Sequence, residues 1–134
     1  MTAKTVLQVT ALALLLVMMQ SKVTLAGTST ASKAAAGTTE TGIAILYSDA
    51  MQGKAVASGE KYDKDALTAA HKTLPLGTMV KVTNLKNKKS VVVKVNDRGP
   101  HGSSKRIIDL SRRAAQELDM IQDGKAQVVL EVVR

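Results

Sequence analysis

Hydrophobic and polar residues alternate in several short runs along the chain. Val80 and Val82 are separated by Lys81, for example, and a run of valines in residues 90–96 repeats the alternation. A period of two residues is typical of β-strands that bury one face, and the valines themselves favour strands. The pattern predicts strands over residues 42–47, 78–84, 90–96, 106–110 and 126–133.

Between these strands the sequence predicts one helix and one hairpin. The helix is expected from about Arg112 to Leu118, with Ser111 as its N-cap and its alanines facing inward. A second, short helical turn is expected around residues 65–70. The hairpin joins the second and third strands, and Asn87 can take the left-handed conformation that its turn requires.

Five or six short strands with a single helix indicate a mainly β protein. Strands this short leave exposed edges unless the sheet closes on itself. We therefore expect a small closed β-barrel rather than an open sheet. Residues 41–134 are predicted to form this one domain.

The N-terminal region has a different composition. Residues 1–26 contain a positive start at Lys4 and an apolar run from Val6 to Met19, which is typical of a secretory signal peptide. An uncleaved anchor is the alternative, and both predict export. Residues 27–40 are mostly Ala, Thr, Ser, Gly and Lys, which predicts a flexible linker.

The composition limits the chemistry and the partners. With 19 Lys and Arg against 11 Asp and Glu the net charge is +8, which favours anionic partners such as cell-wall polymers. Tyr47 and Tyr62 are the only aromatic residues, so nucleic acid is not an expected partner. The chain has no cysteine and two histidines, so we expect no disulfide, no metal site and no cofactor.

Polar residues that could carry chemistry gather in three stretches, at residues 57–63, 69–77 and 96–100. Asp97 follows a valine-rich strand and precedes the turn at Gly99-Pro100, so it is expected at the mouth of the barrel. Functional sites are often built on loops at such mouths. The structural alternative is that Asp97 only caps the turn.

Several motifs, in order and at matching spacing, resemble the rare lipoprotein A family. They are Gly59-Glu60-x-Tyr62-Asp63, Thr68-Ala69-Ala70-His71-Lys72-Thr73-Leu74-Pro75-Leu76-Gly77, Val82-Thr83-Asn84-Leu85, Asn96-Asp97-Arg98-Gly99-Pro100 and Ile107-Ile108-Asp109-Leu110-Ser111. The resemblance implies a six-stranded double-psi β-barrel, related to barwin and expansin domains, with one or two short helices.

The resemblance also implies an activity, namely lytic cleavage of peptidoglycan glycan strands at the β-1,4 bond between N-acetylmuramic acid and N-acetylglucosamine. The 6-hydroxyl of the muramic acid would attack its own anomeric carbon and leave a 1,6-anhydro end. The family's functional residues correspond to Glu60, His71 and Asp97. Asp97 would donate a proton to the leaving oxygen and then accept one from the hydroxyl, assisted by a desolvated cleft or by Glu60.

Other predicted site residues would contact the substrate or support the site. They are Tyr62, Asp63, Lys72, Asn96 and Arg98. A structural role is the alternative for several of them. Arg98 would then tie strand ends together or pair with a carboxylate such as Asp109, and His71 would be a hydrogen-bonded histidine beside the barrel.

The sequence departs from the family pattern at some positions. Leu46 and Met51 stand where the family often has aromatic residues, and Val56 replaces a usual threonine. Because sugar rings bind well on aromatic faces, weaker glycan binding is expected. A non-catalytic, expansin-like wall-binding module is therefore the alternative function, and a secreted effector is a third. No cysteine follows the predicted signal peptide, so we expect no lipid anchor. We also expect the protein to be a monomer and to be periplasmic or secreted.

Overall fold

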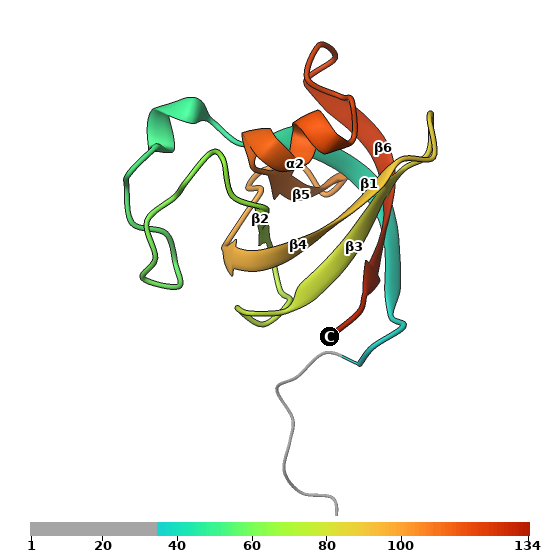
Figure 1. The fold of residues 1–134 in the computed structure, drawn as a ribbon. Coiled ribbons are helices and arrows are strands. Elements are labelled where there is room, and N and C mark those ends of the chain that lie inside the picture. The colour runs from blue at the N-terminus through green and yellow to red at the C-terminus, as the bar shows by residue number, and fades with distance from the viewer. Residues whose placement is uncertain (1–34) are drawn as a thin grey trace, which may run out of the picture. The chain divides into compact units, whose positions relative to one another are not determined.

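The computed structural model describes residues 35–134, which form one closed β-barrel (Figure 1). Six strands, one short α-helix and one turn of 3-10 helix make up this part of the chain. In order they are β1 (Thr39–Leu46), η3 (Asp49–Met51), β2 (Thr68–His71), β3 (Met79–Asn84), β4 (Ser90–Asp97), β5 (Arg106–Leu110), α2 (Arg112–Glu117) and β6 (Lys125–Val132). The predicted mainly β, six-stranded barrel is confirmed.

The strands are interleaved around the barrel in the order β1-β5-β2-β4-β3-β6, and β6 closes it by pairing with β1. Two of the six pairings are parallel, β1 with β5 and β2 with β4. The other four are antiparallel, including the predicted hairpin of β3 and β4. This order places the end of β4 and the middle of β5 on either side of the short strand β2.

The valines that alternate in the sequence form the inside of the barrel. Val80, Val82, Val93 and Val95 are fully buried, and they belong to one core cluster with residues from β5, β6 and α2. The intervening residues, such as Lys81, are exposed. The helix begins where it was predicted, since the Ser111 hydroxyl accepts a hydrogen bond from the Ala114 amide at 3.2 Å.

Two local predictions need correction, and one element was not predicted. The helical turn predicted around residues 65–70 is wrong, because Thr68–His71 form β2, a strand in addition to the five predicted ones. Its alanines favour a helix, but hydrogen bonds to β4 on one side and β5 on the other fix an extended backbone. In the hairpin, Lys88 and not Asn87 takes the left-handed conformation, with φ at 66°. The helical turn at η3 was not predicted.

The structure bears on only part of the predicted N-terminal organisation. The predicted signal peptide and residues 27–34 of the predicted linker lie outside the described residues. β1 begins at Thr39, two residues before the expected start of the domain at Thr41. Within residues 35–134, no helix has the length and apolar character needed to cross a membrane.

Candidate active site

A cleft of about 510 Å³ opens beside the end of β1 and brings together residues from distant parts of the sequence. Its polar lining consists of Tyr47, Ser48, Asp97, Arg98, His101 and Asp109. Leu46 and Met51, where the family pattern has aromatic residues, also line it. Another hollow, of about 450 Å³ and lined by residues such as Ile43 and Gln127, contains none of the predicted site residues.

Asp97 is the last residue of β4, and hydrogen bonds hold both of its carboxylate oxygens. The Tyr47 hydroxyl donates to Oδ2 at 2.5 Å, and the Ala57 amide donates to Oδ1 at 2.9 Å. These two donors fix the orientation of the Asp97 carboxylate in the cleft.

Tyr47 is half-buried beside this carboxylate. Burial, the hydrogen bond to Asp97 and the negative charges of Asp97 and Asp109 raise the pKa of Tyr47 far above its ordinary value. Its hydroxyl is therefore a hydrogen-bond donor at any physiological pH. Its ring packs against Tyr62, with ring centroids 4.5 Å apart.

Asp109 is a second carboxyl group in the cleft that the sequence analysis did not assign to the site. It lies in β5 and pairs with Ile45 of β1 and with Ala70 of β2. Burial is the main cause that raises the pKa of Asp109 to about 6, and the charge of Asp97 adds to it. In the sequence, the sign of a partly buried carboxyl group is an aspartate between two large apolar residues, Ile108 and Leu110. Both of these neighbours are fully buried in the structure.

The two aspartates are neighbours because of the strand order. Asp97 of β4 and Asp109 of β5 are both register partners of Ala70 in β2. Register partners on adjacent strands project to the same side of a sheet, and strands lie about 4.8 Å apart. Both carboxyl groups therefore emerge on one face, separated by a single small side chain.

Glu60 lies on an exposed loop and does not line the cleft. Its carboxylate accepts hydrogen bonds from Lys94 at 2.7 Å and from the Ser58 hydroxyl at 2.9 Å. These contacts, above all that with Lys94, lower the pKa of Glu60. The carboxylate that interacts with Asp97 is thus Asp109 rather than the expected Glu60.

His71 ends β2, is buried and is also outside the cleft lining. Its Nδ1 accepts hydrogen bonds from the amides of Thr73 and Leu74, both at 3.1 Å. The remaining proton is therefore on Nε2, which donates to Glu40 at 2.8 Å. These contacts match the structural role that was the alternative for His71, in which a neutral histidine fixes the turn after β2.

Arg98 connects the cleft to that same turn. Its guanidinium donates to the carbonyl oxygens of His71 at 3.1 Å and Leu74 at 2.7 Å. The suggested pairing of Arg98 with Asp109 is wrong, because the guanidinium is committed to these carbonyls. One face of Arg98 still lines the cleft.

The remaining predicted site residues are dispersed. The buried Tyr62 accepts a hydrogen bond from the Arg112 amide at 3.3 Å, and Asn96 is also buried. Asp63 accepts from the Asp65 amide at 2.9 Å, and Lys72 donates to the Ser103 carbonyl at 2.8 Å. None of these four residues lines the cleft.

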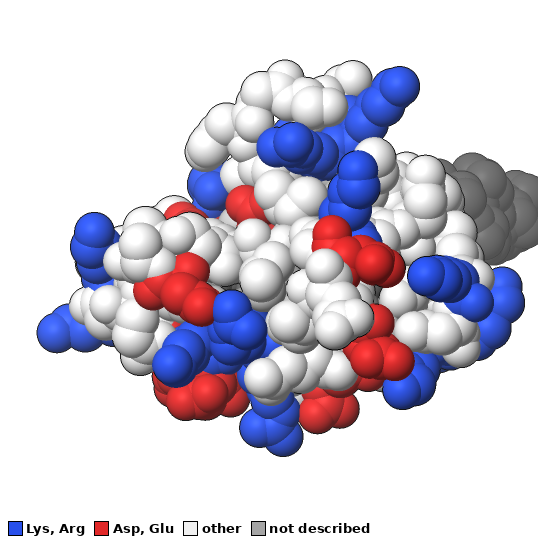
Figure 2. All heavy atoms as spheres, turned by 90° about the horizontal axis from the view of Figure 1, so that it is seen from above, with Lys and Arg blue, Asp and Glu red and all other residues white. Residues whose placement is uncertain are grey.

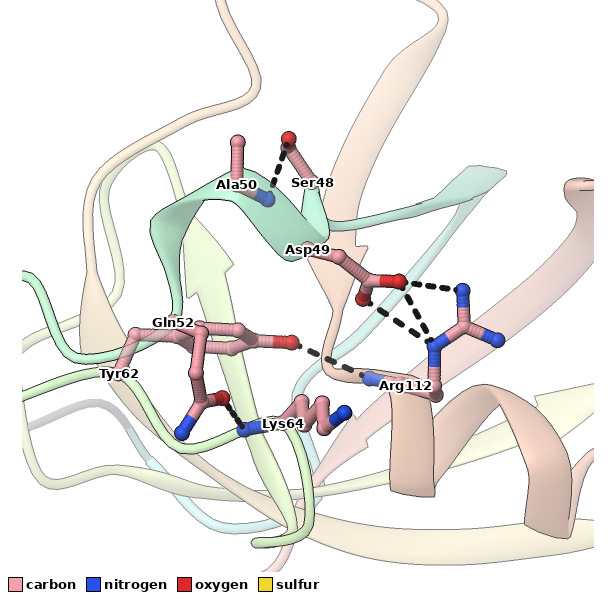
Figure 3. A network of polar contacts seen from close by, with 7 residues as sticks. All are labelled: Ser48, Asp49, Ala50, Gln52, Tyr62, Lys64 and Arg112. Carbon is pink, nitrogen blue, oxygen red and sulfur yellow. Dashed lines mark hydrogen bonds and ion pairs between the residues drawn. The ribbon is translucent and has the colours of Figure 1, made fainter.

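The segment between β1 and β2, which carries Tyr47 and Ala57, is attached to the barrel by a polar network (Figure 3). Arg112, at the start of α2, makes a forked contact with the carboxylate of Asp49, with the shortest distance 2.6 Å. Gln52 accepts a hydrogen bond from the Lys64 amide at 2.8 Å and so joins the two arms of the segment. The network fixes the donors that orient Asp97.

Charged side chains of both signs lie on the face of the molecule above the view of Figure 1. Basic and acidic side chains are interspersed on the face that Figure 2 shows, with no single basic patch. Among residues 35–134 there is no group of three or more side chains placed to hold a metal ion. The fold and cleft define a class of protein, namely a closed barrel with a cleft that presents carboxyl groups and a tyrosine.

Comparison with known proteins gives this class a family. The family model described as lytic transglycolase matches residues 39–130, so the chain belongs to that family. It is 54% identical over 99 residues to the endolytic peptidoglycan transglycosylase RlpA of Campylobacter jejuni, and 52% identical over 96 residues to that of Neisseria meningitidis serogroup A. The resemblance to the rare lipoprotein A family is thereby confirmed.

These relatives are longer proteins. The matches cover 74% and 71% of this chain but only 36% and 39% of the respective relatives. The matched part therefore spans between a third and two fifths of the length of these two relatives.

Solved structures confirm the barrel. A Streptomyces papain inhibitor superposes with a TM-score of 0.60 at 26% identity, covering 74% of this chain and 97% of that one. A mutant Clavibacter michiganensis expansin in complex with cellohexaose gives a TM-score of 0.58 at 23% identity, covering 72% and 51%. The expansin shows the shared fold alone.

Proposed function

We propose that this chain is a lytic transglycosylase that cleaves the β-1,4 bond between N-acetylmuramic acid and N-acetylglucosamine in peptidoglycan. The observation that carries the proposal is the oriented Asp97 carboxylate in an open cleft, held by Tyr47 and Ala57. Family membership and the names of the relatives support the choice of substrate.

The reaction requires one proton to be given and one to be taken. The leaving glycosidic oxygen must be protonated, and the 6-hydroxyl must lose its proton as it closes the 1,6-anhydro ring. Because the nucleophile belongs to the substrate, the protein does not have to position a water molecule, unlike an inverting hydrolase. The sequence-based hypothesis assigns both transfers to Asp97. The position of Asp97 in the cleft supports a direct part in the reaction.

Glu60 and His71 act at a distance from the reacting bond in this proposal. Glu60, with Ser58 and Lys94, extends the polar surface over which a glycan strand would run. His71 supports the turn to which Arg98 is tied. Tyr62, Asp63, Lys72 and Asn96 likewise support the loops around the cleft.

The test uses the purified protein and its Asp97→Asn variant. Both are incubated with intact peptidoglycan and with glycan strands from which an amidase has removed the peptides, and soluble products are analysed by mass spectrometry. We expect 1,6-anhydro products with the natural protein only. If both proteins bind the polymer and release nothing, the expansin-like binding module is the better description.

We further propose that the protein is exported and acts as a monomer in the periplasm or outside the cell. The apolar run near the N-terminus and its positive start support export. Fractionation of cells that express the full chain, with N-terminal sequencing of the product, tests this. Recovery in the cytoplasm with residue 1 intact would contradict it.

A further inference from the structure

Asp109 lines the same cleft as Asp97. Both aspartates flank Ala70 on the same side of the sheet, and both line the cleft. Gly99, just beyond Asp97, comes close to the Asp109 carboxyl group. A β-carbon at this position would lie 3.1 Å from Oδ2 of Asp109, so the glycine keeps this oxygen uncovered.

The two carboxyl groups have opposite surroundings. Asp97 accepts hydrogen bonds at both oxygens, from Tyr47 and Ala57. Oδ1 of Asp109 is buried and has no hydrogen-bond partner among residues 35–134. A buried, unpaired oxygen is far more costly on a carboxylate than on a neutral acid. A pair of carboxyl groups whose environments differ in this way is what separate acid and base roles require.

We propose that Asp109 is the proton donor of the reaction and that Asp97 is the base. This inference rests on the proposed function and divides between two residues what the sequence assigned to one. Asp109 gives its proton to the glycosidic oxygen as the bond from that oxygen to the anomeric carbon breaks. The 6-hydroxyl oxygen then bonds to the anomeric carbon, and its proton passes to Asp97.

The proton balance closes without water being consumed. One proton leaves Asp109 and one arrives at Asp97, so the protein ends with a carboxylate at 109 and an acid at 97. Exchange with solvent through the open cleft returns both groups to their starting states. The products are an alcohol at the new glycan end and a 1,6-anhydro ring.

The charged groups around Asp109 are consistent with this role. Burial and the negative charge of Asp97 raise the pKa of Asp109, while the nearby His101 and Arg106 lower it, for a net value of about 6. Tyr47 also faces this pair and stays protonated. About a tenth of Asp109 is then protonated at pH 7, so kcat/KM should rise as the pH falls from 8 to 6.

The test compares two substrates that differ in their need for an acid. The natural glycan has a poor leaving group, whereas a 2,4-dinitrophenyl glycoside of N-acetylmuramic acid releases a phenolate that needs no proton. Asp109→Asn should lower 1,6-anhydro formation from the glycan by about 100-fold or more, and from the dinitrophenyl glycoside by less than about 10-fold. Asp97→Asn should impair both reactions.

The controls make each outcome decisive. Asp119 is exposed and does not line the cleft, so Asp119→Asn should match the natural protein on both substrates. Circular dichroism should show native folding for all variants. Natural activity of Asp109→Asn on the glycan, or equal losses on the two substrates, would overturn the acid role while leaving the transglycosylase function intact. No 1,6-anhydro product from the natural protein would overturn both proposals.

A measurement on the unaltered protein covers the case in which Asp109→Asn does not fold. Carbon-13 NMR follows the aspartate carboxyl carbons while the pH is changed from 3 to 8. A carboxyl that titrates near pH 6 and is assigned to Asp109 supports the proposal. Titration of Asp109 near its ordinary value of 3.8 contradicts it.

Discussion

At the scale of single residues, the site shows how surroundings give identical side chains different properties. Asp97 and Asp109 are both aspartates at neighbouring positions of the barrel. The first is held in place by donors from Tyr47 and Ala57, whereas the second lies in a largely desolvated position with an unpaired oxygen. The difference predicts distinct effects of substitution.

Replacing Asp109 should change stability in a pH-dependent way. Its folded-state pKa of about 6 lies above the ordinary value of 3.8, so the folded protein loses stability as the pH rises through this window. Asp109→Asn should therefore raise the free energy of unfolding at pH 7 by about 1 to 2 kcal/mol, allowing for solvent screening, and by little at pH 3.5. Urea unfolding at the two pH values measures this difference, and an equal change at both would contradict it.

Tyr47 should matter for activity more than for folding. Tyr47→Phe removes the hydroxyl that donates to Oδ2 of Asp97 but keeps the ring that packs on Tyr62. A hydrogen bond to a charged group is worth about 1.5 to 3 kcal/mol, so we expect a loss of about 10- to 100-fold in kcat/KM. Product release from peptidoglycan measures the rate. An unchanged rate, with melting temperature preserved, would show that Ala57 alone suffices to orient Asp97.

At the scale of elements, the site depends on a long segment with little regular structure. Residues 47–67 contain η3 and one isolated bridge between Ala55 and Lys61, yet they supply both donors to Asp97. Their attachment to α2 passes through the forked contact between Arg112 and Asp49 (Figure 3). An arginine fork fixes orientation better than a single point charge does.

Arg112 and its neighbour Arg113 allow a matched comparison. Arg112→Ala should make residues 48–66 more sensitive to limited proteolysis and reduce activity, because the segment loses its side-chain link to α2 and keeps only backbone contacts such as that of the Arg113 amide with the Lys64 carbonyl, at 2.9 Å. Arg113 contacts Glu117 only within the helix, at 3.1 Å, so Arg113→Ala should leave both properties near those of the natural protein. Protease cleavage rates and mass spectrometry of the fragments give the comparison. Equal rates for the two variants would show that the segment is held by other contacts.

At the scale of the whole molecule, closure of the barrel makes the strands interdependent. β6, the last strand of the chain, pairs with β1 and with β3 and joins two otherwise free edges. Its side chains reach the common core, where Leu130 is 2% exposed. A defect in β6 should therefore weaken the entire domain rather than one edge.

Leu130→Ala tests this interdependence. Removing a buried leucine side chain should lower the free energy of unfolding by about 2 to 5 kcal/mol, in a single cooperative transition. Val133→Ala, just beyond β6 and 40% exposed, should cost about 0.5 kcal/mol or less. Urea unfolding followed by circular dichroism and by NMR of β1 amides measures both. Loss of β1 signals at a different urea concentration from the global transition would contradict a single unit.

Local patterns in the sequence determine the greater part of the secondary structure. Alternating valines mark β3 and β4 because a strand with one buried face must repeat every two residues, and Ser111 marks the start of α2 because its hydroxyl caps a free amide. β2 escapes such analysis, since Thr-Ala-Ala-His has no alternation and is extended only by its pairing with β4 and β5. Asp97 could be selected from its place at a strand end and from the family motifs.

The sequence by itself thus determined the class of fold, most strand positions, the family resemblance and Asp97, because each depends on neighbours along the chain. Only the tertiary structure decided which side chains meet. It brought Asp97 and Asp109 to the two sides of one strand, β2, which lies between them in space but precedes both in sequence. It also separated Glu60 and His71 from the cleft by giving them other hydrogen-bond partners. Burial and charge at Asp109 arise from contacts between β1, β2, β4 and β5, and such long-range contacts leave no local pattern in the sequence.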